Sequence, residues 1–189
     1  MGRHAEQGKY IVHEASPTSA ANLEWFCQQW GLQDYAQLNR WVADLPKAGS
    51  QLLFAPFLYG SNAGLGLSAS FYGIQAFHQR EHLVQAIFEG VVFCHMTHLN
   101  RMRQRFPQAK ALRVTGGPAK SAPWMQMFAD VSGLPVELPQ VEGNRLFRCS
   151  NGCHGGHRRF QRLCRRAAGI GSTHRNRSAR SRRSGCLPP

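Results

Sequence analysis

Apolar positions recur at strand or helix spacing through most of residues 1–142. Alternation of apolar and polar side chains over residues 9–13 predicts a short strand. Helical spacing predicts a first helix over residues 22–30, with Asn22 as its N-cap, and a second helix over residues 35–45.

The middle of the chain predicts two strands followed by a long helix. A continuous apolar run over residues 52–58 indicates a buried or edge strand, and residues 59–64 have the composition of a loop. A second strand is expected over residues 70–74, and helical spacing is sustained over residues 80–106. Gly90 interrupts that helix at a cost of about 1 kcal/mol relative to alanine, so we expect close backbone packing there.

The last organised part predicts a strand, a turn, a helix and a strand. Residues 111–115 form the first strand, the sequence Gly-Gly-Pro the turn, residues 122–132 the helix and residues 135–138 the second strand. Strands that alternate with helices indicate an α/β or α+β layer architecture.

Composition narrows the class of protein. The chain has 189 residues, 42% of them hydrophobic, and no apolar run approaches the roughly 20 residues of a membrane span. The first nine residues lack the apolar core of a secretion signal, so we expect a cytoplasmic protein without a membrane partner. Cys27 and Cys94 stand alone in apolar surroundings, as reduced core cysteines do.

Charge divides the chain in two. The formal net charge is +13, yet residues 1–142 hold 11 basic and 10 acidic side chains. Residues 143–189 hold 12 arginines, four of the six cysteines and no acidic residue. We therefore place a boundary after Glu142, between an organised domain and an Arg/Cys-rich tail.

The Gly-Gly turn is the most informative local feature. Gly116 and Gly117, between a strand and a helix, let a ligand approach the backbone, and the helix offers N–H groups to an anion. This pattern favours the phosphate or ribose edge of a nucleotide, although it lacks the spacing of a Walker A loop, and a plain structural turn is the alternative. Ser121 and Gln126 are polar positions that could face a ligand or water.

Other titratable residues give weaker indications of a metal site or a catalytic group. His95 and His98 are three positions apart on one helix, which is a metal-binding spacing. No carboxylate or cysteine is placed to complete such a set, so we expect packed or solvated imidazoles and assign no metal ligand. Glu89 on the same helix could be a general base, but it has no placed partner, so we predict a surface residue and assign no catalytic residue.

Four segments together resemble one known family, the FGGY carbohydrate kinases. The match extends over about residues 8–142, and the motifs stand in the family's order. The segments are S-P-T-S-A-A-N-L-E-W-F, F-L-Y-G-S-N-A-G, A-S-F-Y-G-I followed after seven residues by H-L-V-Q-A-I-F-E, and V-T-G-G-P-A-K-S-A-P-W-M-Q-M-F-A-D-V-S-G-L-P-V.

The resemblance implies an α/β domain of the actin-like ATPase (ribonuclease H-like) fold, present here in part. It implies ATP-dependent phosphorylation of a ketose or related sugar, with Mg²⁺. Gly116 and Gly117 would lie against the nucleotide, and Ser121 stands where some members have an Asn that contacts the adenine side. The family's catalytic aspartate, phosphate-binding hairpin and most sugar contacts belong to its N-terminal domain. None of those motifs occurs here, so we expect a fragment that is inactive alone and a separate N-terminal kinase domain as partner.

Three interpretations compete for residues 143–189. The arginines could form a basic arm that binds nucleic acid, which is the alternative function of the chain. The set Cys149, Cys153, His154 and His157 has zinc-binding residue types at irregular spacing. The favoured interpretation is an out-of-frame translation that is disordered. Permitted codons for the residues after Glu142, read one nucleotide later, give E-T-G-C-L-G-A-A, which matches the family's continuation.

Overall fold

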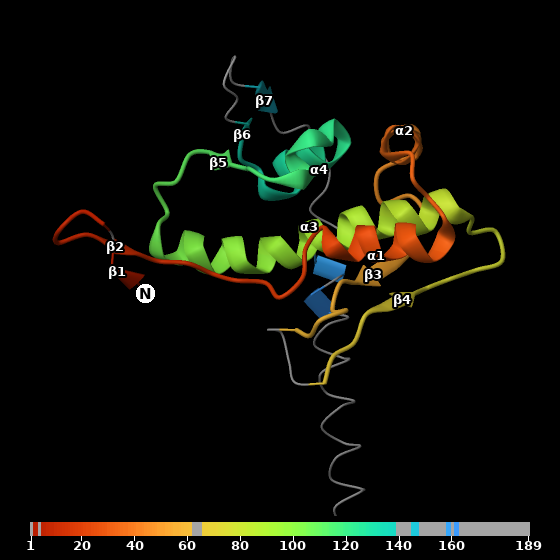
Figure 1. The fold of residues 1–189 in the computed structure, drawn as a ribbon, viewed down its shortest axis with the longest axis horizontal. Helices are drawn as coiled ribbons and strands as arrows, with labels where there is room; N and C mark the ends of the chain where they lie inside the picture. Colours follow the sequence, from red (N-terminus) through yellow and green to blue (C-terminus); the bar gives the residue numbers. More distant parts are fainter. Residues whose placement is uncertain are drawn as a thin grey trace, which may run out of the picture.

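A long central helix organises the structure. The computed structural model describes residues 2–3, 5–61, 66–138, 145–147, 158–159 and 161–162. Helix α3 (Arg80–Arg105) has 26 residues and runs across most of the fold in Figure 1, a length of roughly 39 Å. Its predicted extent is confirmed to within one residue. The elements packed on it are α1 (Ala21–Trp30), α2 (Tyr35–Asp44), β3 (Leu53–Ala55) and α4 (Ala122–Ser132).

Helix α3 is buried on all sides over residues 84–94. Helices and a strand cover it from several directions, so its apolar residues surround the helix instead of forming one stripe. At Gly90 the backbone of β3 comes so close that an added Cβ would collide with the carbonyl oxygen of Phe54. The predicted close backbone packing at this glycine is therefore confirmed.

Among the described residues, the strands form three small sheets. Strand β1 (Gly2–Arg3) pairs antiparallel with β2 (Tyr10–Ile11), and β3 pairs antiparallel with β4 (Ser70–Tyr72). The third sheet has the order β5 (Leu112–Arg113), β6 (Val136–Leu138) and β7 (Arg145–Phe147), with β5 parallel to β6. All five predicted strands are present, each shorter than its apolar pattern.

The parallel pair β5–β6 is joined by a helical crossover. The 3₁₀ helix η1 (Gly117–Lys120) and α4 connect the two strands, as parallel strands require. Helix α4 matches its predicted bounds because both ends carry local signals: Ser121 caps its start and Gly133, with a φ of 69°, closes its end. The Gly-Gly turn therefore lies at the carboxyl end of a strand, immediately before a helix.

The predicted cap of α1 is wrong. The N-cap position belongs to Ala20, and Asn22 lies inside the first turn with its side chain fully buried. The Asn22 Nδ2 donates back to the Ser19 carbonyl at 2.8 Å, so the amide supports the chain before the helix. Asp34 caps α2, and its Oδ1 accepts hydrogen bonds from the backbone N–H groups of Ala36 and Gln37.

The core contains buried side chains from α1, α2, α3 and α4. Its largest fully buried apolar side chains are Phe26, Leu38, Leu52, Ile87, Phe88 and Met125. Cys27 and Cys94 are buried free thiols, as predicted, and burial raises the pKa of both. Within the described part of the chain, every helix is too short or too polar to cross a bilayer. The predicted boundary after Glu142 lies outside the described residues.

Candidate functional site

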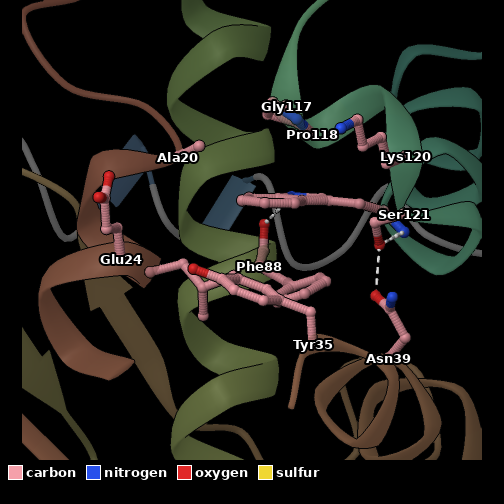
Figure 2. A pocket seen from close by; sticks show the side chains of 11 residues that line it. Ala20, Glu24, Tyr35, Asn39, Phe88, Gly117, Pro118, Lys120 and Ser121 are labelled. Atoms are coloured by element: carbon pink, nitrogen blue, oxygen red, sulfur yellow. Dashed lines mark hydrogen bonds between the residues drawn. The ribbon is translucent and has the colours of Figure 1, made fainter. Parts of the chain in front are cut away.

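A pocket opens where the Gly-Gly turn meets the first two helices. Its volume is about 420 Å³, within the range of small-molecule sites. Figure 2 shows its lining, which comes from α1 and the residue before it, α2, α3, η1 and the start of α4. The lining residues are Ala20, Leu23, Glu24, Tyr35, Asn39, Phe88, Gly117, Pro118, Lys120, Ser121 and Trp124.

Aromatic rings form the walls of this pocket. Trp124 is 2% exposed and stacks on Phe88 with a centroid separation of 4.3 Å. Its indole Nε1 donates to the Phe88 carbonyl at 3.1 Å, which fixes the orientation of the ring. Tyr35 stands at the start of α2, and burial raises the pKa of its hydroxyl, with added repulsion from Cys27 and Glu24. Flat apolar walls of this kind suit a planar aromatic ligand.

The two predicted glycines have different roles. Gly116 has a φ of 95° and a ψ of −169°, a conformation that is essentially restricted to glycine, and it does not line the pocket. Gly117 does line the pocket, and an added Cβ there would meet no atom within 4 Å. Gly116 therefore shapes the turn, and Gly117 leaves open space at the pocket wall.

The start of α4 offers fewer N–H groups than the sequence predicted. Pro118 and Pro123 have none, and the Ala119 N–H donates to the Gly116 carbonyl at 3.1 Å. The Trp124 N–H donates to Ser121 Oγ at 3.3 Å. Because these N–H groups already donate to Ser121 and Gly116, this helix end has fewer N–H groups left to bind an anion.

Ser121 lines the pocket and is joined to α2. Its side chain is 8% exposed, and its hydroxyl donates to Asn39 Oδ1 at 2.6 Å (Figure 2). Sequence reasoning missed Asn39, which is 82 positions away along the chain and belongs to no motif. Gln126, the other polar position singled out in α4, donates to Asp130 Oδ1 at 2.8 Å and does not line the pocket.

One charge of each sign lies at the pocket. Glu24 and Lys120 are exposed, and Figure 2 shows them at different sides of the cavity, on α1 and η1. The pocket thus combines apolar aromatic walls with two charged groups at its edge. This is the composition expected of a site for an aromatic ligand that also carries polar groups.

The other titratable positions lie outside this pocket. His95 Nε2 is 2.8 Å from Ser19 Oγ, and His98 Nδ1 is 3.0 Å from Glu14 Oε2. Burial, followed by the neighbouring His98, lowers the pKa of His95. Within the described residues, no three His, Cys, Asp or Glu side chains lie together in a way that could hold a metal ion.

The prediction that Glu89 is a surface residue is wrong. The side chain is 8% exposed in the middle of α3, and burial raises its pKa to about 7 even though the Ala48 N–H donates to it. The distance from Ala48 N to Glu89 Oε1 is 3.0 Å. The carboxyl group holds the loop that follows α2 and takes no part in the pocket.

The arrangement of helices and strands matches the actin-like ATPase fold. Solved structures with this arrangement are sugar kinases of the actin-like ATPase fold. Xylulose kinase from Rhodospirillum rubrum has a TM-score of 0.64 at 20% identity, over 84% of this chain and 38% of that chain. A kinase structure from Brucella ovis has a TM-score of 0.67 at 22% identity, over 82% and 39%. The expected fold is therefore confirmed.

The sequence identifies the family. The profile described as "FGGY family of carbohydrate kinases, C-terminal domain" matches residues 3–145, so the chain belongs to that family. L-xylulose/3-keto-L-gulonate kinase of Escherichia coli K12 is 64% identical over 146 residues, which are 77% of this chain and 29% of that protein. Probable L-xylulose kinase of Pasteurella multocida Pm70 is 64% identical over 75% of this chain and 29% of that protein.

The chain thus spans less than a third of the length of these curated relatives. All of them are sugar kinases, and none supports the alternative function of nucleic-acid binding. That alternative and the zinc-knuckle interpretation both rest on residues 143–189, most of which lie outside the described residues.

Proposed function

We propose that this chain is the nucleotide-binding part of an ATP-dependent sugar kinase. The adenosine end of ATP would occupy the pocket beside Gly117 and Ser121, and Gly116 would hold the turn in shape. The observation that carries the proposal is an aromatic-walled cavity of about 420 Å³ next to the family's Gly-Gly turn. The open space at Gly117 gives room for a ligand against the backbone.

ATP supplies the phosphoryl group, and Mg²⁺ would arrive with its phosphates. Mg²⁺ is commonly held by substrate phosphates with only one or two carboxylates. The contribution of this chain is to bind and orient the nucleotide base, with Trp124 and Tyr35 as apolar walls.

The proposed sugar substrate is a ketose such as L-xylulose. The support is the 64% identity to two relatives that are named as L-xylulose kinases. Phosphoryl transfer requires a positioned base, metal and phosphate clamp acting together. We assign those groups to the part of the relatives that this chain does not match, and we propose that the chain is inactive without a separate N-terminal kinase domain.

The proposed organisation is a kinase domain over residues 1–142 and a tail of out-of-frame origin over residues 143–189. The family match over residues 3–145 supports the first part of this division. The sharp change from nearly balanced charge to 12 arginines without an acidic residue supports the second. Sequencing the gene across the Glu142 codon tests it, because an undisturbed reading frame through residue 189 in independent isolates would contradict a frameshift.

Isothermal titration of the full chain with ADP tests the nucleotide proposal. We expect one site per chain that accepts ADP and AMP and that gives no heat with L-xylulose alone. A coupled assay with ATP, Mg²⁺ and L-xylulose should show no turnover above background. Absence of ADP binding by the folded chain would overturn the nucleotide assignment, and turnover would overturn the proposed inactivity.

A further inference from the structure

Ser121 and Asn39 form a hydrogen-bonded pair across the pocket. Ser121 begins α4 and Asn39 lies one turn into α2, so the pair links two walls of the cavity (Figure 2). The Ser121 hydroxyl accepts the Trp124 N–H at 3.3 Å and gives its single proton to Asn39 Oδ1 at 2.6 Å. In this arrangement the hydroxyl both accepts and donates a hydrogen bond, and the oxygen of the Asn39 amide is the group that receives its proton.

The same bond leaves the NH₂ group of Asn39 available. Within the described residues, the hydrogen bond from Ser121 is the only one made by the Asn39 side chain. Asn39 is half-buried and lines the cavity together with Tyr35 and Trp124. An amide whose oxygen accepts this bond keeps two donor hydrogens on its nitrogen, and Asn39 is one of the residues that line the pocket.

We infer that Asn39 contacts the base: its Nδ2 donates to a ring nitrogen of the purine, and Ser121 is the positioning residue that fixes the amide for this contact. The inference rests on the proposed function, since it requires a purine in this pocket. Adenine presents only acceptors at its ring nitrogens, so a fixed donor matches it. A site built around one fixed hydrogen-bonding group discriminates strongly against ligands that lack the complementary atom.

The decisive variant is Asn39→Asp, which keeps an oxygen to accept the Ser121 proton and replaces the donor by a second acceptor. If Asn39 had only a structural role, this substitution would leave the Kd for adenosine unchanged. We expect the Kd for adenosine to rise about 10-fold or more, the usual effect of losing one such hydrogen bond at a buried site. Adenosine is the appropriate probe because it has no phosphate for the new carboxylate to repel.

Gln37→Glu is the matched control, since it adds a carboxylate to an exposed position of the same helix. It should leave the Kd for adenosine within about twofold. Ser121→Ala removes the group that fixes the amide, and we expect a smaller rise in the Kd than that caused by Asn39→Asp. Thermal melting by circular dichroism shows that each variant is folded.

Ligand variation tests the inference without any mutation. The wild-type chain is titrated with 1-deaza-, 3-deaza- and 7-deazaadenosine, each of which lacks one ring nitrogen. We expect one of the three to bind about 10-fold more weakly than adenosine, and this penalty to disappear in Asn39→Ala. Equal binding of all three, or a Kd unchanged in folded Asn39→Asp, would overturn the inference while adenosine binding upholds the proposed function. A wild-type chain that binds neither adenosine nor ADP would overturn both.

Discussion

The ammonium Nζ of Lys47 lies 2.6 Å from Oδ2 of Asp130, although the Asp130 side chain is completely buried and that of Lys47 is half exposed. Lys47 belongs to the loop after α2, and Asp130 belongs to α4. The pair therefore ties together the two helices that hold Asn39 and Ser121 in the pocket wall. Removing the cation from a buried ion pair is strongly destabilising, because the carboxylate then stays buried without its ion-pair partner Lys47.

Lys47→Met should consequently lower the free energy of unfolding by about 2 kcal/mol, a value reduced from that of a fully buried pair because Lys47 is partly solvated. Asp130→Asn in the Lys47→Met background should restore part of the loss, since it removes the negative charge that Lys47 no longer balances. Urea unfolding of the single and double variants measures both effects. Lys110→Met, at an exposed position, serves as the control. Strictly additive losses would show that the two side chains do not stabilise each other.

The contact between Gly90 and Phe54 predicts that one added methyl group lowers stability more than Lys47→Met does. Alanine normally favours a helix by about 1 kcal/mol over glycine. At Gly90, however, the new methyl group would collide with the Phe54 carbonyl, which is backbone and cannot rotate away. We expect Gly90→Ala to destabilise the protein by about 3 kcal/mol, at the upper end of overpacking costs.

Chemical unfolding monitored by tryptophan fluorescence measures this cost. Gln104→Ala, on an exposed position of the same helix, should change stability by less than about 0.5 kcal/mol. Equal stability of Gly90→Ala and the wild type would mean that β3 is free to move away from α3. Such a result would contradict the close packing that the structure places between these two elements.

Residues 116 and 117 should respond differently to the same substitution. Gly116→Ala forces a side chain into a conformation reserved for glycine and should cost about 1–3 kcal/mol of stability. Gly117→Ala adds a methyl group in open space and should leave stability within about 0.5 kcal/mol of the wild type. If a nucleotide lies against Gly117, the added methyl group should still weaken ADP binding by about 10-fold.

Melting temperatures and ADP titrations of the two variants separate these effects. The expected pattern is a stable Gly117→Ala chain with reduced affinity and a destabilised Gly116→Ala chain. Unchanged ADP affinity in the stable Gly117→Ala variant would place the nucleotide away from this residue.

Local signals explain which parts of this structure were predictable. The bounds of α4 are predictable to the residue because Ser121 and Gly133 mark its two ends, and those of α3 are predictable because its apolar pattern is long. Asn22 was misassigned because a capping residue type before a helix does not reveal which carbonyl its amide will reach. Asn39 was missed because its contact with Ser121 depends on how α2 packs against α4, which no local pattern encodes.

Glu89 shows that a local pattern also fails to predict the burial of a charged residue. A glutamate in a helix is normally predicted to face solvent. At Glu89, however, α3 is covered on every side by other elements. The loop that Glu89 holds contains two non-glycine residues in the left-handed region, Ala48 at a φ of 54° and Gln51 at 56°. A buried acceptor at Ala48 N–H helps to hold this uncommon conformation.

The buried carboxyl of Glu89 should make stability fall as the pH rises. Burial raises its pKa from 4.5 to about 7 in the folded protein, so between these values the folded chain keeps a proton that the unfolded chain has lost. The stabilising effect of that proton is greatest at the acidic end of this interval and is lost as the pH rises through about 7. This shift of the pKa corresponds to a decrease of about 3 kcal/mol in the free energy of unfolding as the pH rises from 4.5 to about 7.

Glu89→Gln should remove this dependence, because glutamine keeps an oxygen for the Ala48 N–H and has no charge to bury. Urea unfolding at about pH 5 and about pH 8 should therefore show the variant gaining stability relative to the wild type at the higher pH. The lowered pKa of His95 acts in the opposite direction, with stability lost on acidification, but it is common to both proteins and cancels in the difference. A difference between variant and wild type that stays constant across this range would mean that Glu89 is ionised in the folded protein without penalty.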